Sequence, residues 1–86
     1  MPLVCVHGPL RQLAGDAREH QLQAATVLEL LRELERAYPA LCGWIVDERG
    51  LIRRHINVFV DGERSGEQTA VAAGARVEIL PAITGG

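Results

Sequence analysis

The residues with the clearest chemical potential are Gly85 and Gly86, which follow a short apolar strand, a proline and a run of small residues. Glycine has no Cβ, so both residues can adopt backbone conformations closed to other residues and can enter a narrow channel. Such a channel would receive the α-carboxylate of Gly86. We therefore predict that this carboxylate is the reactive group of the protein. The alternative is a frayed tail, because chain ends are often loose.

Other reactive side chains offer no arrangement typical of catalysis or metal binding. Cys5 lies in an apolar strand and is predicted to be a core residue, since free cysteine behaves as a small hydrophobe. Cys42 is predicted to be a core residue as well. His7, His20 and His55 have no metal-ligand spacing with each other or with the cysteines, so we predict no metal site. No Ser-His-Asp set or phosphate loop is present in the sequence, which makes an enzyme the least favoured interpretation.

The composition predicts one small domain. Its 86 residues, 48% of them apolar, suffice for a single modest core. A net charge of −2 gives no support for a nucleic-acid surface, which would need a clear basic excess. The first residues lack the features of a signal peptide, and no apolar run approaches the roughly 20 residues that span a bilayer. We therefore expect a soluble, cytoplasmic protein that binds neither nucleic acid nor membranes.

A helix is predicted over residues 26–38. Thr26 and Glu29 have the spacing of a capping box, and from Val27 onward apolar residues recur at spacings of three and four. Pro39 ends the helix, because it lacks an N–H and disfavours helical geometry in the preceding residue. The helix therefore presents one wide apolar stripe to the core.

Short strands flank this helix. Residues 3–7 form an apolar run with β-branched side chains, and residues 18–23 suit an edge strand paired with it. Residues 56–60 alternate and end at Asp61-Gly62, a strong hairpin signal. Residues 76–80 form the last strand.

The remaining segment, residues 40–55, is expected to contain a short turn or helical piece that closes one end of the core with Leu41, Trp44, Ile45 and Val46. The order strand, strand, helix and further strands is typical of an α+β protein with one main helix across one face of a mixed sheet of four to five strands. With the first and last strands adjacent in the middle, this is the β-grasp (ubiquitin-like) arrangement. Spacing alone leaves other small α+β folds open.

Four segments, taken in order, cover the chain from end to end: Leu10-Arg11-Gln12-Leu13-Ala14-Gly15, Tyr38-Pro39-Ala40-Leu41, Ile56-Asn57-Val58-Phe59-Val60-Asp61-Gly62 and Val77-Glu78-Ile79-Leu80-Pro81-Ala82-Ile83-Thr84-Gly85-Gly86. Together they resemble the ThiS/MoaD-type ubiquitin-like sulfur carrier proteins. The ending is more similar to the MoaD and cysteine-biosynthesis carriers than to the thiazole carriers. One departure is Gly74-Ala75, where family members often have Gly-Asp; it touches no chemistry.

The resemblance implies that an ATP-dependent activating enzyme of the MoeB/ThiF-like class adenylates Gly86 and that sulfur then replaces the adenylate to leave a thiocarboxylate. It implies no bound cofactor, since ATP is used by the activating enzyme. The sulfur would pass to a sulfur-accepting synthase in cysteine biosynthesis or to the large subunit of molybdopterin synthase. The expected division is a domain over residues 1–80 and a flexible tail over residues 81–86, in which Pro81, Thr84 and Gly85 serve tail recognition.

A partner also needs a surface to hold. If Val77 and Ile79 face the helix, strand alternation places Leu80 on the opposite, solvent-facing side, and the same argument applies to Phe59. We predict a docking patch of Leu80 and Phe59 rimmed by arginines, Arg53 and Arg54 among them. The alternative for Phe59 is a position under Trp44 or a loop.

Two other functions remain open. A ubiquitin-like modifier would pass the same activated carboxylate to a lysine amine of another protein. The chain has arginine but no lysine, so it cannot form lysine-linked polymers of itself, which mildly disfavours this alternative. A non-catalytic β-grasp interaction module would carry an inert tail, and its function would survive removal of Gly85 and Gly86.

Overall fold

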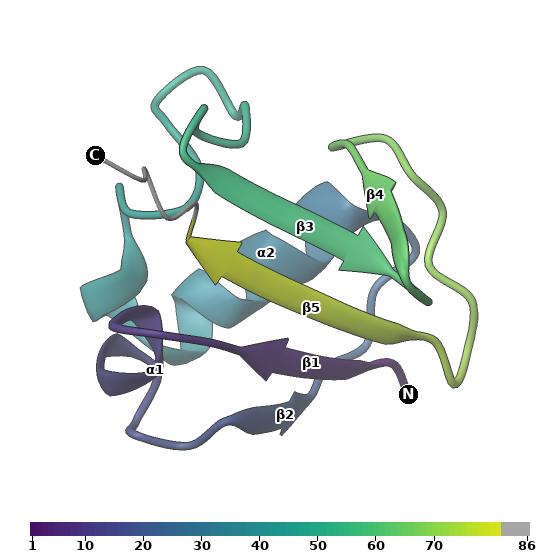
Figure 1. Ribbon diagram of the computed structural model, residues 1–86, viewed down its shortest axis with the longest axis horizontal. Coiled ribbons are helices and arrows are strands. Elements are labelled where there is room, and N and C mark those ends of the chain that lie inside the picture. Colours follow the sequence, from purple (N-terminus) through teal and green to yellow (C-terminus); the bar gives the residue numbers. More distant parts are fainter. Residues whose placement is uncertain (82–86) are drawn as a thin grey trace.

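A mixed five-stranded sheet with the strand order β2-β1-β5-β3-β4 is the frame of the computed structural model, which describes residues 1–81 (Figure 1). The chain runs through the elements in the following order: β1 (Leu3–Val6), α1 (Leu10–Leu13), β2 (Glu19–Gln21), α2 (Val27–Ala37), the 3-10 helix η1 (Pro39–Leu41), β3 (Ile56–Val60), β4 (Glu63–Ser65) and β5 (Arg76–Pro81).

The first and last strands lie side by side in the middle of the sheet. β1 and β5 are parallel, whereas β2 pairs antiparallel with β1, and β3 pairs antiparallel with both β5 and β4. The helix α2 crosses one face of the sheet (Figure 1). The α+β class and the β-grasp arrangement predicted from the sequence are therefore confirmed.

The helix α2 forms where the capping pattern predicts it. The Thr26 hydroxyl accepts a hydrogen bond from the Glu29 backbone N–H at 3.3 Å, which satisfies one of the unpaired donors of the first turn. The helix ends at Ala37, and Pro39 begins η1. The stripe that α2 buries against the sheet comprises Val27, Leu30, Leu31 and Leu34.

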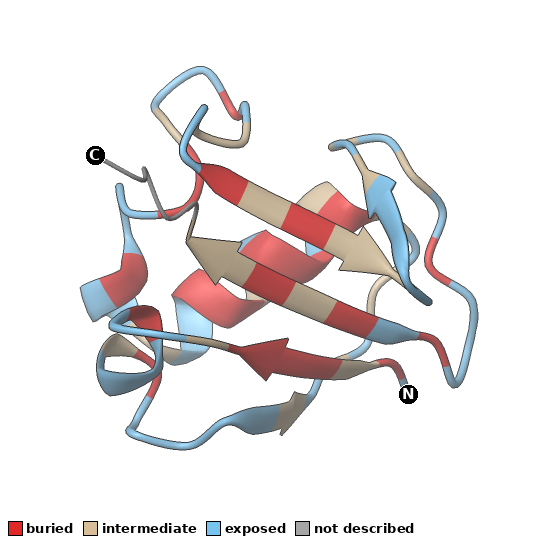
Figure 2. Cartoon of the chain, in the orientation of Figure 1, coloured by how far each residue is buried: buried red, intermediate tan, exposed pale blue. Residues whose placement is uncertain are grey.

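The core lies between α2 and one face of the sheet. Along β3 and β5, buried residues alternate with half-buried ones, as Figure 2 shows by alternating red and tan. This period of two is the geometry of a strand with one face turned inward. The strand residues that meet the helix are Val4, Val6, Ile56, Val58, Val77 and Ile79. We call the opposite side of the sheet the outer face.

The hairpin between β3 and β4 follows the Asp61-Gly62 signal. Both residues have positive φ, 50° at Asp61 and 85° at Gly62, as a two-residue turn of this hand requires. The Asp61 carboxylate also accepts a hydrogen bond from the Arg76 backbone N–H at 2.9 Å. The turn is thereby tied to the start of β5, and it leads into the short strand β4.

Two expectations for the segment after α2 are wrong. Leu41, Ile45 and Val46 are buried as predicted, but Trp44 is 54% exposed and Cys42 is exposed as well. The reason is the tight turn that follows η1, in which the Trp44 N–H donates to the Leu41 carbonyl at 2.9 Å and Gly43 has φ +86°. This turn points the side chains between Leu41 and Ile45 away from the core.

None of the helices in the described part of the chain has the length and apolar character that crossing a membrane would require.

Candidate functional site

The end of β5 is the root from which the predicted tail departs. Pro81 is the last described residue; it pairs with Ile56, the first residue of β3. A proline is tolerated here because it stands at the end of the ladder. The strand thus runs one residue further than the predicted end at Leu80. Gly86, Gly85 and Thr84 lie outside the described residues, and the predicted division between domain and tail stays a prediction.

The loop after β1 packs directly on this root. Gly8 has φ +64°, and a Cβ built at this position would lie 3.0 Å from Cγ of Pro81. Only glycine combines this backbone conformation with so close an approach. The His7 backbone N–H also donates to the Ile79 carbonyl at 3.1 Å, which continues the β1–β5 pairing toward the tail. The last residues of β5 are therefore held on both sides, by β1 and by β3.

The register places Leu80 and Phe59 on the outer face. Phe59 pairs with Glu78, and Leu80 pairs with Asn57, so the two apolar side chains occupy diagonal positions within reach of each other. Both are half-buried, and neither belongs to the core cluster. Trp44, the residue that was the alternative cover for Phe59, lines a pocket together with Ile56. Ile56 belongs to the core on the helix side of the sheet, opposite to the face that carries Phe59. The patch prediction requires Leu80 and Phe59 to lie on the same outer face, and the strand register places them there.

A contact between His7 and Glu78 borders this apolar pair. The His7 Nε2 atom lies 3.3 Å from a carboxylate oxygen of Glu78, and both side chains are about one-third exposed. Glu78 lies between Cys5 and Phe59 in the cross-strand register. Sequence reasoning did not single out either member of the pair. Strand alternation in the sequence was enough to put Glu78 on the same face as Leu80. Its contact with His7 could be found only from the pairing register of β1 and β5.

Cys5 lies beneath this surface and is fully buried. Burial is the main cause that raises the pKa of its thiol, with Arg76 acting in the opposite direction. Because the thiolate is the nucleophilic form of cysteine, a raised pKa leaves Cys5 unreactive. Its predicted place in the interior is confirmed, and a role as a sulfur-carrying thiol is disfavoured.

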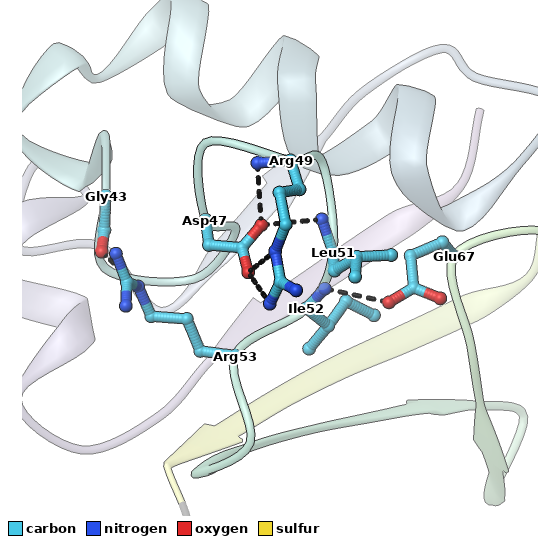
Figure 3. Close-up of polar contacts among 7 residues, drawn as sticks. All are labelled: Gly43, Asp47, Arg49, Leu51, Ile52, Arg53 and Glu67. Carbon is cyan, nitrogen blue, oxygen red and sulfur yellow. Dashed lines mark hydrogen bonds and ion pairs between the residues drawn. The ribbon is translucent and has the colours of Figure 1, made fainter.

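Arg53 and Arg54 lie at the tail end of the sheet and not around Phe59. Both precede Ile56, which pairs with Pro81. Arg53 is half-buried and donates from Nε to the Gly43 carbonyl, as Figure 3 shows, whereas Arg54 is exposed. Within residues 1–81, neither arginine forms an ion pair. The two arginines therefore belong to the segment that leads into β3, and the structure does not place them as a rim around Phe59.

A network of hydrogen bonds fixes the segment that leads into β3 (Figure 3). The Asp47 carboxylate accepts from the Arg49 guanidinium at 2.8 Å and from the backbone N–H groups of Arg49 and Leu51 at 2.9 and 3.1 Å. These bonds, the Arg49 side-chain bond foremost, lower the pKa of Asp47 to about 2. The Glu67 carboxylate accepts from the Ile52 N–H at 2.8 Å. The loop that carries Trp44 is thus braced at several points.

In the part of the chain that the structure describes, no three His, Cys, Asp or Glu side chains converge where a metal ion could bind. The groups at the end of β5 form a surface of half-buried apolar side chains with charged side chains beside them.

Comparison with known proteins agrees with this arrangement. The ThiS family model matches residues 4–86. Small archaeal modifier protein 3 of Haloferax volcanii is 35% identical over 66 residues, which cover 72% of this chain and 71% of that protein.

Two solved structures are similar over nearly the whole chain. Small archaeal modifier protein 1 of Haloferax volcanii has a TM-score of 0.88 at 31% identity and covers 99% of this chain and 98% of its own. The CysO protein in the Amycolatopsis orientalis BexX/CysO complex has a TM-score of 0.90 at 30% identity and covers 100% of both chains.

Proposed function

The chain belongs to the ThiS family of ubiquitin-like small modifier and sulfur carrier proteins, and from this premise we propose that it is a sulfur carrier that reacts through the carboxylate of Gly86. Members of this family are small carrier proteins and not enzymes. The observation that carries the proposal is that the family match extends through Gly86. Gly86, the residue proposed to react, lies five positions beyond Pro81, the last residue of β5.

The proposed reaction has two steps because a carboxylate is a poor acyl donor. In a MoeB/ThiF-like activating enzyme, a carboxylate oxygen of Gly86 attacks the α-phosphorus of ATP, and pyrophosphate leaves. Hydrosulfide then attacks the acyl carbon, AMP leaves with the electrons of the broken C–O bond, and the S–H proton is lost to solvent. The resulting thiocarboxylate donates its sulfur to a synthase of cysteine biosynthesis or to the large subunit of molybdopterin synthase. ATP is assigned to the activating enzyme, and no cofactor is assigned to this chain.

The surface proposed to hold these partners is the outer face at the end of β5. Leu80 directly precedes Pro81 and lies diagonal to Phe59, with Glu78 and His7 beside them. Half-buried apolar side chains bordered by charge are suited to a docking site, because the apolar area gives affinity and the charges give specificity. The Amycolatopsis orientalis CysO protein was solved in a complex with BexX, which supports a role for partner proteins here as well.

A second candidate function is that of a protein modifier. It is favoured by the 35% identity to small archaeal modifier protein 3. Activation would be the same, but a lysine amine of a target protein would attack the acyl carbon in place of sulfur. In either case, recognition of the tail would depend on Pro81, Thr84 and Gly85, since both routes pass through the activating enzyme.

The first experiment is an intact-mass measurement on the protein purified from its own host cells. We expect a species heavier by the replacement of one oxygen with sulfur, located to Gly86 by fragmentation. Protein-conjugated forms would favour the modifier function, and unmodified mass after incubation with ATP, a sulfide source and the activating enzyme would contradict both.

Two variants make this measurement specific to the tail. Deletion of Gly86 is expected to abolish the sulfur-containing species. Gly85→Ala keeps the carboxylate but adds a Cβ where a narrow channel has no room, so thiocarboxylate formation should slow. Arg49→Ala, in the loop before β3, is the matched control and should leave the sulfur-containing species at the wild-type level.

A further inference from the structure

A hollow of about 280 Å³ lies beside the turn that follows η1, and the proposed sulfur chemistry does not use it. Its lining residues are Gly43, Trp44, Arg53 and His55. Trp44 is 54% exposed, so a large part of an aromatic side chain stays in contact with water. Tryptophan and arginine are among the residues enriched at the energetic centres of protein interfaces. This hollow is therefore a candidate interaction surface.

The backbone on both sides of Trp44 is held by one residue from further along the chain. The Arg53 backbone N–H donates to the Ile45 carbonyl at 2.8 Å, and the Arg53 Nε donates to the Gly43 carbonyl (Figure 3). Gly43 and Ile45 directly precede and follow Trp44. A side chain on a backbone that is already fixed loses little conformational entropy when a partner covers it.

Positive charge lies next to this indole. Arg53 also lines a neighbouring hollow of about 250 Å³, and Arg54 lines that second hollow with it. Within residues 1–81, neither arginine has a carboxylate at ion-pair distance, whereas Arg36 and Arg49 each do. The one acidic residue that lines the second hollow is Glu67, and its carboxylate already accepts a backbone hydrogen bond at 2.8 Å. The two guanidinium groups therefore remain available to a partner's carboxylates.

We propose that the two hollows, which share Arg53, form a docking surface for a short acidic segment of a partner protein. We call it the Trp44 surface and define it by Trp44, Arg53, Arg54 and His55. An aliphatic side chain of the segment packs on the indole, and its carboxylates accept charge-assisted hydrogen bonds from the two arginines. The apolar contact supplies affinity, and the arginines select for negative charge.

The charge of the whole chain favours a short acidic segment over an extended polyanion. The chain has a net charge of −2, so nucleic acid or an anionic membrane is repelled by the surface outside the two hollows. A short segment needs complementary charge only at the Trp44 surface. The hollow beside the indole also suits a protein side chain, because it is present before any partner binds.

The Trp44 surface is separate from the patch of Phe59 and Leu80. Ile56 and Val58 line its second hollow, and both belong to the core on the helix side of the sheet. Phe59 and Leu80 lie on the outer face. Neither that patch nor the Gly86 carboxylate takes part in the proposed contact, which therefore does not depend on the sulfur chemistry.

The test uses the isolated full chain and a blocked pentapeptide with one leucine between two pairs of glutamates. Trp44 is the single tryptophan, so its fluorescence reports on the surface directly. Saturable binding should shift its emission to shorter wavelength and reduce its quenching by acrylamide, because the leucine covers the indole. The same peptide with glutamine in place of glutamate should bind about tenfold more weakly, since it lacks the charge-assisted bonds.

Two matched variants locate the binding. Arg54→Gln should weaken binding of the acidic peptide about tenfold and leave the neutral peptide unaffected. Arg18→Gln is the control, because Arg18 is also exposed, lies outside both hollows and changes the net charge by the same amount. It should bind the acidic peptide as the wild type does. Amide chemical-shift changes on binding should concentrate in residues 43–55.

The proposal is overturned if the acidic peptide leaves the Trp44 emission unchanged or binds no more tightly than the neutral one. It is also overturned if Arg18→Gln weakens binding as much as Arg54→Gln, since net charge alone would then be responsible. Tighter binding at Trp44 by a thymidine oligonucleotide or by phosphatidylserine vesicles would assign the surface to another class of ligand. None of these measurements involves thiocarboxylate formation, so the two proposals fail separately.

Discussion

The two faces of the sheet are built by the same strands and differ in how deeply their side chains are buried. On β3 and β5, the side that meets α2 carries Val58 and Ile79, which are 1% and 0% exposed. The outer side of the same strands carries Phe59 and Leu80, which are half-buried and outside the core cluster. Neighbouring residues thus have opposite environments.

This difference separates stability from recognition along a single strand. A residue that packs against α2 contributes to the free energy of folding, because its apolar area is removed from water on folding. A half-buried residue on the outer face, such as Leu80, keeps part of that area exposed to solvent, where the proposed partner would contact it. Substitutions one position apart in β5 should therefore affect different measurements.

The largest expected effect is on the helix side. Ile79→Ala removes a fully buried side chain and leaves a cavity between α2 and the sheet. Such substitutions typically lower the free energy of unfolding by about 2–5 kcal/mol. Urea denaturation followed by circular dichroism measures this loss. A loss no larger than that of Leu80→Ala would show that the two faces do not differ as proposed.

On the outer face, Leu80→Ala is expected to lower the free energy of unfolding less than Ile79→Ala does, and to affect thiocarboxylate formation more. Leu80→Ala should slow thiocarboxylate formation about tenfold or more, the loss typical of a side chain at the centre of an interface. The measurement is the initial rate with the cognate activating enzyme, ATP and a sulfide source. The unfolding midpoint in urea should change less than for Ile79→Ala.

Leu3→Ala is the control for this result. Leu3 is also half-buried and on the outer face, but it pairs with Arg76 at the far end of β5 from the tail. The rate should remain near that of the wild type. An equal slowing in both variants would indicate a general effect of outer-face area and would remove the special position of Leu80.

The sequence could predict these faces because strand and helix periods follow directly from backbone geometry. The alternation of residues 56–60 and the capping box at Thr26 placed β3 and α2 correctly, and the predicted neighbours β1 and β5 are paired. Trp44 and Cys42 were misplaced because their exposure depends on a turn that is fixed by Arg53, about ten residues further along the chain. A hydrogen bond of this kind leaves no period in the sequence.

For the candidate site as well, the sequence predicted the features that follow from strand alternation and missed those that depend on tertiary packing. Alternation put Leu80 and Phe59 on one face, but the His7–Glu78 contact requires the parallel register of β1 and β5. The pocket at the tail root requires four separate segments to meet around Pro81. Such features arise from tertiary packing and cannot be found by inspecting one segment at a time.

A further prediction concerns charge on the outer face. Glu78→Gln removes the negative charge beside His7, in a contact in which both side chains are about one-third exposed. Pairs this exposed typically contribute between about 0 and 1 kcal/mol, so the free energy of unfolding should change by less than that of a core residue. Urea denaturation measures it. A loss comparable to that of Ile79→Ala would contradict the view that outer-face contacts add little to folding.

The smallest expected effect tests the buried layer itself, where Glu35 is the one charged side chain among the buried residues that the structure describes. Burial raises the pKa of its carboxyl group above the usual 4.5, while Arg32, with Nη1 at 3.7 Å, acts in the opposite direction. A carboxyl group whose pKa is higher in the folded protein favours folding when it is protonated, and this contribution is lost as the pH rises through the folded pKa. At neutral pH the ionised Glu35 therefore lowers stability.

Glu35→Gln should accordingly raise the free energy of unfolding at neutral pH by roughly 0.5 kcal/mol. The gain should diminish as the pH falls and should be absent well below the ordinary pKa of 4.5, where Glu35 is protonated in both the folded and the unfolded state. Urea denaturation at the two pH values measures the difference. Glu33→Gln, on the same helix with a side chain that is 38% exposed and paired with Arg36, should show no gain at either pH. An equal gain in both variants would mean that net charge, and not the burial of Glu35, determines the effect.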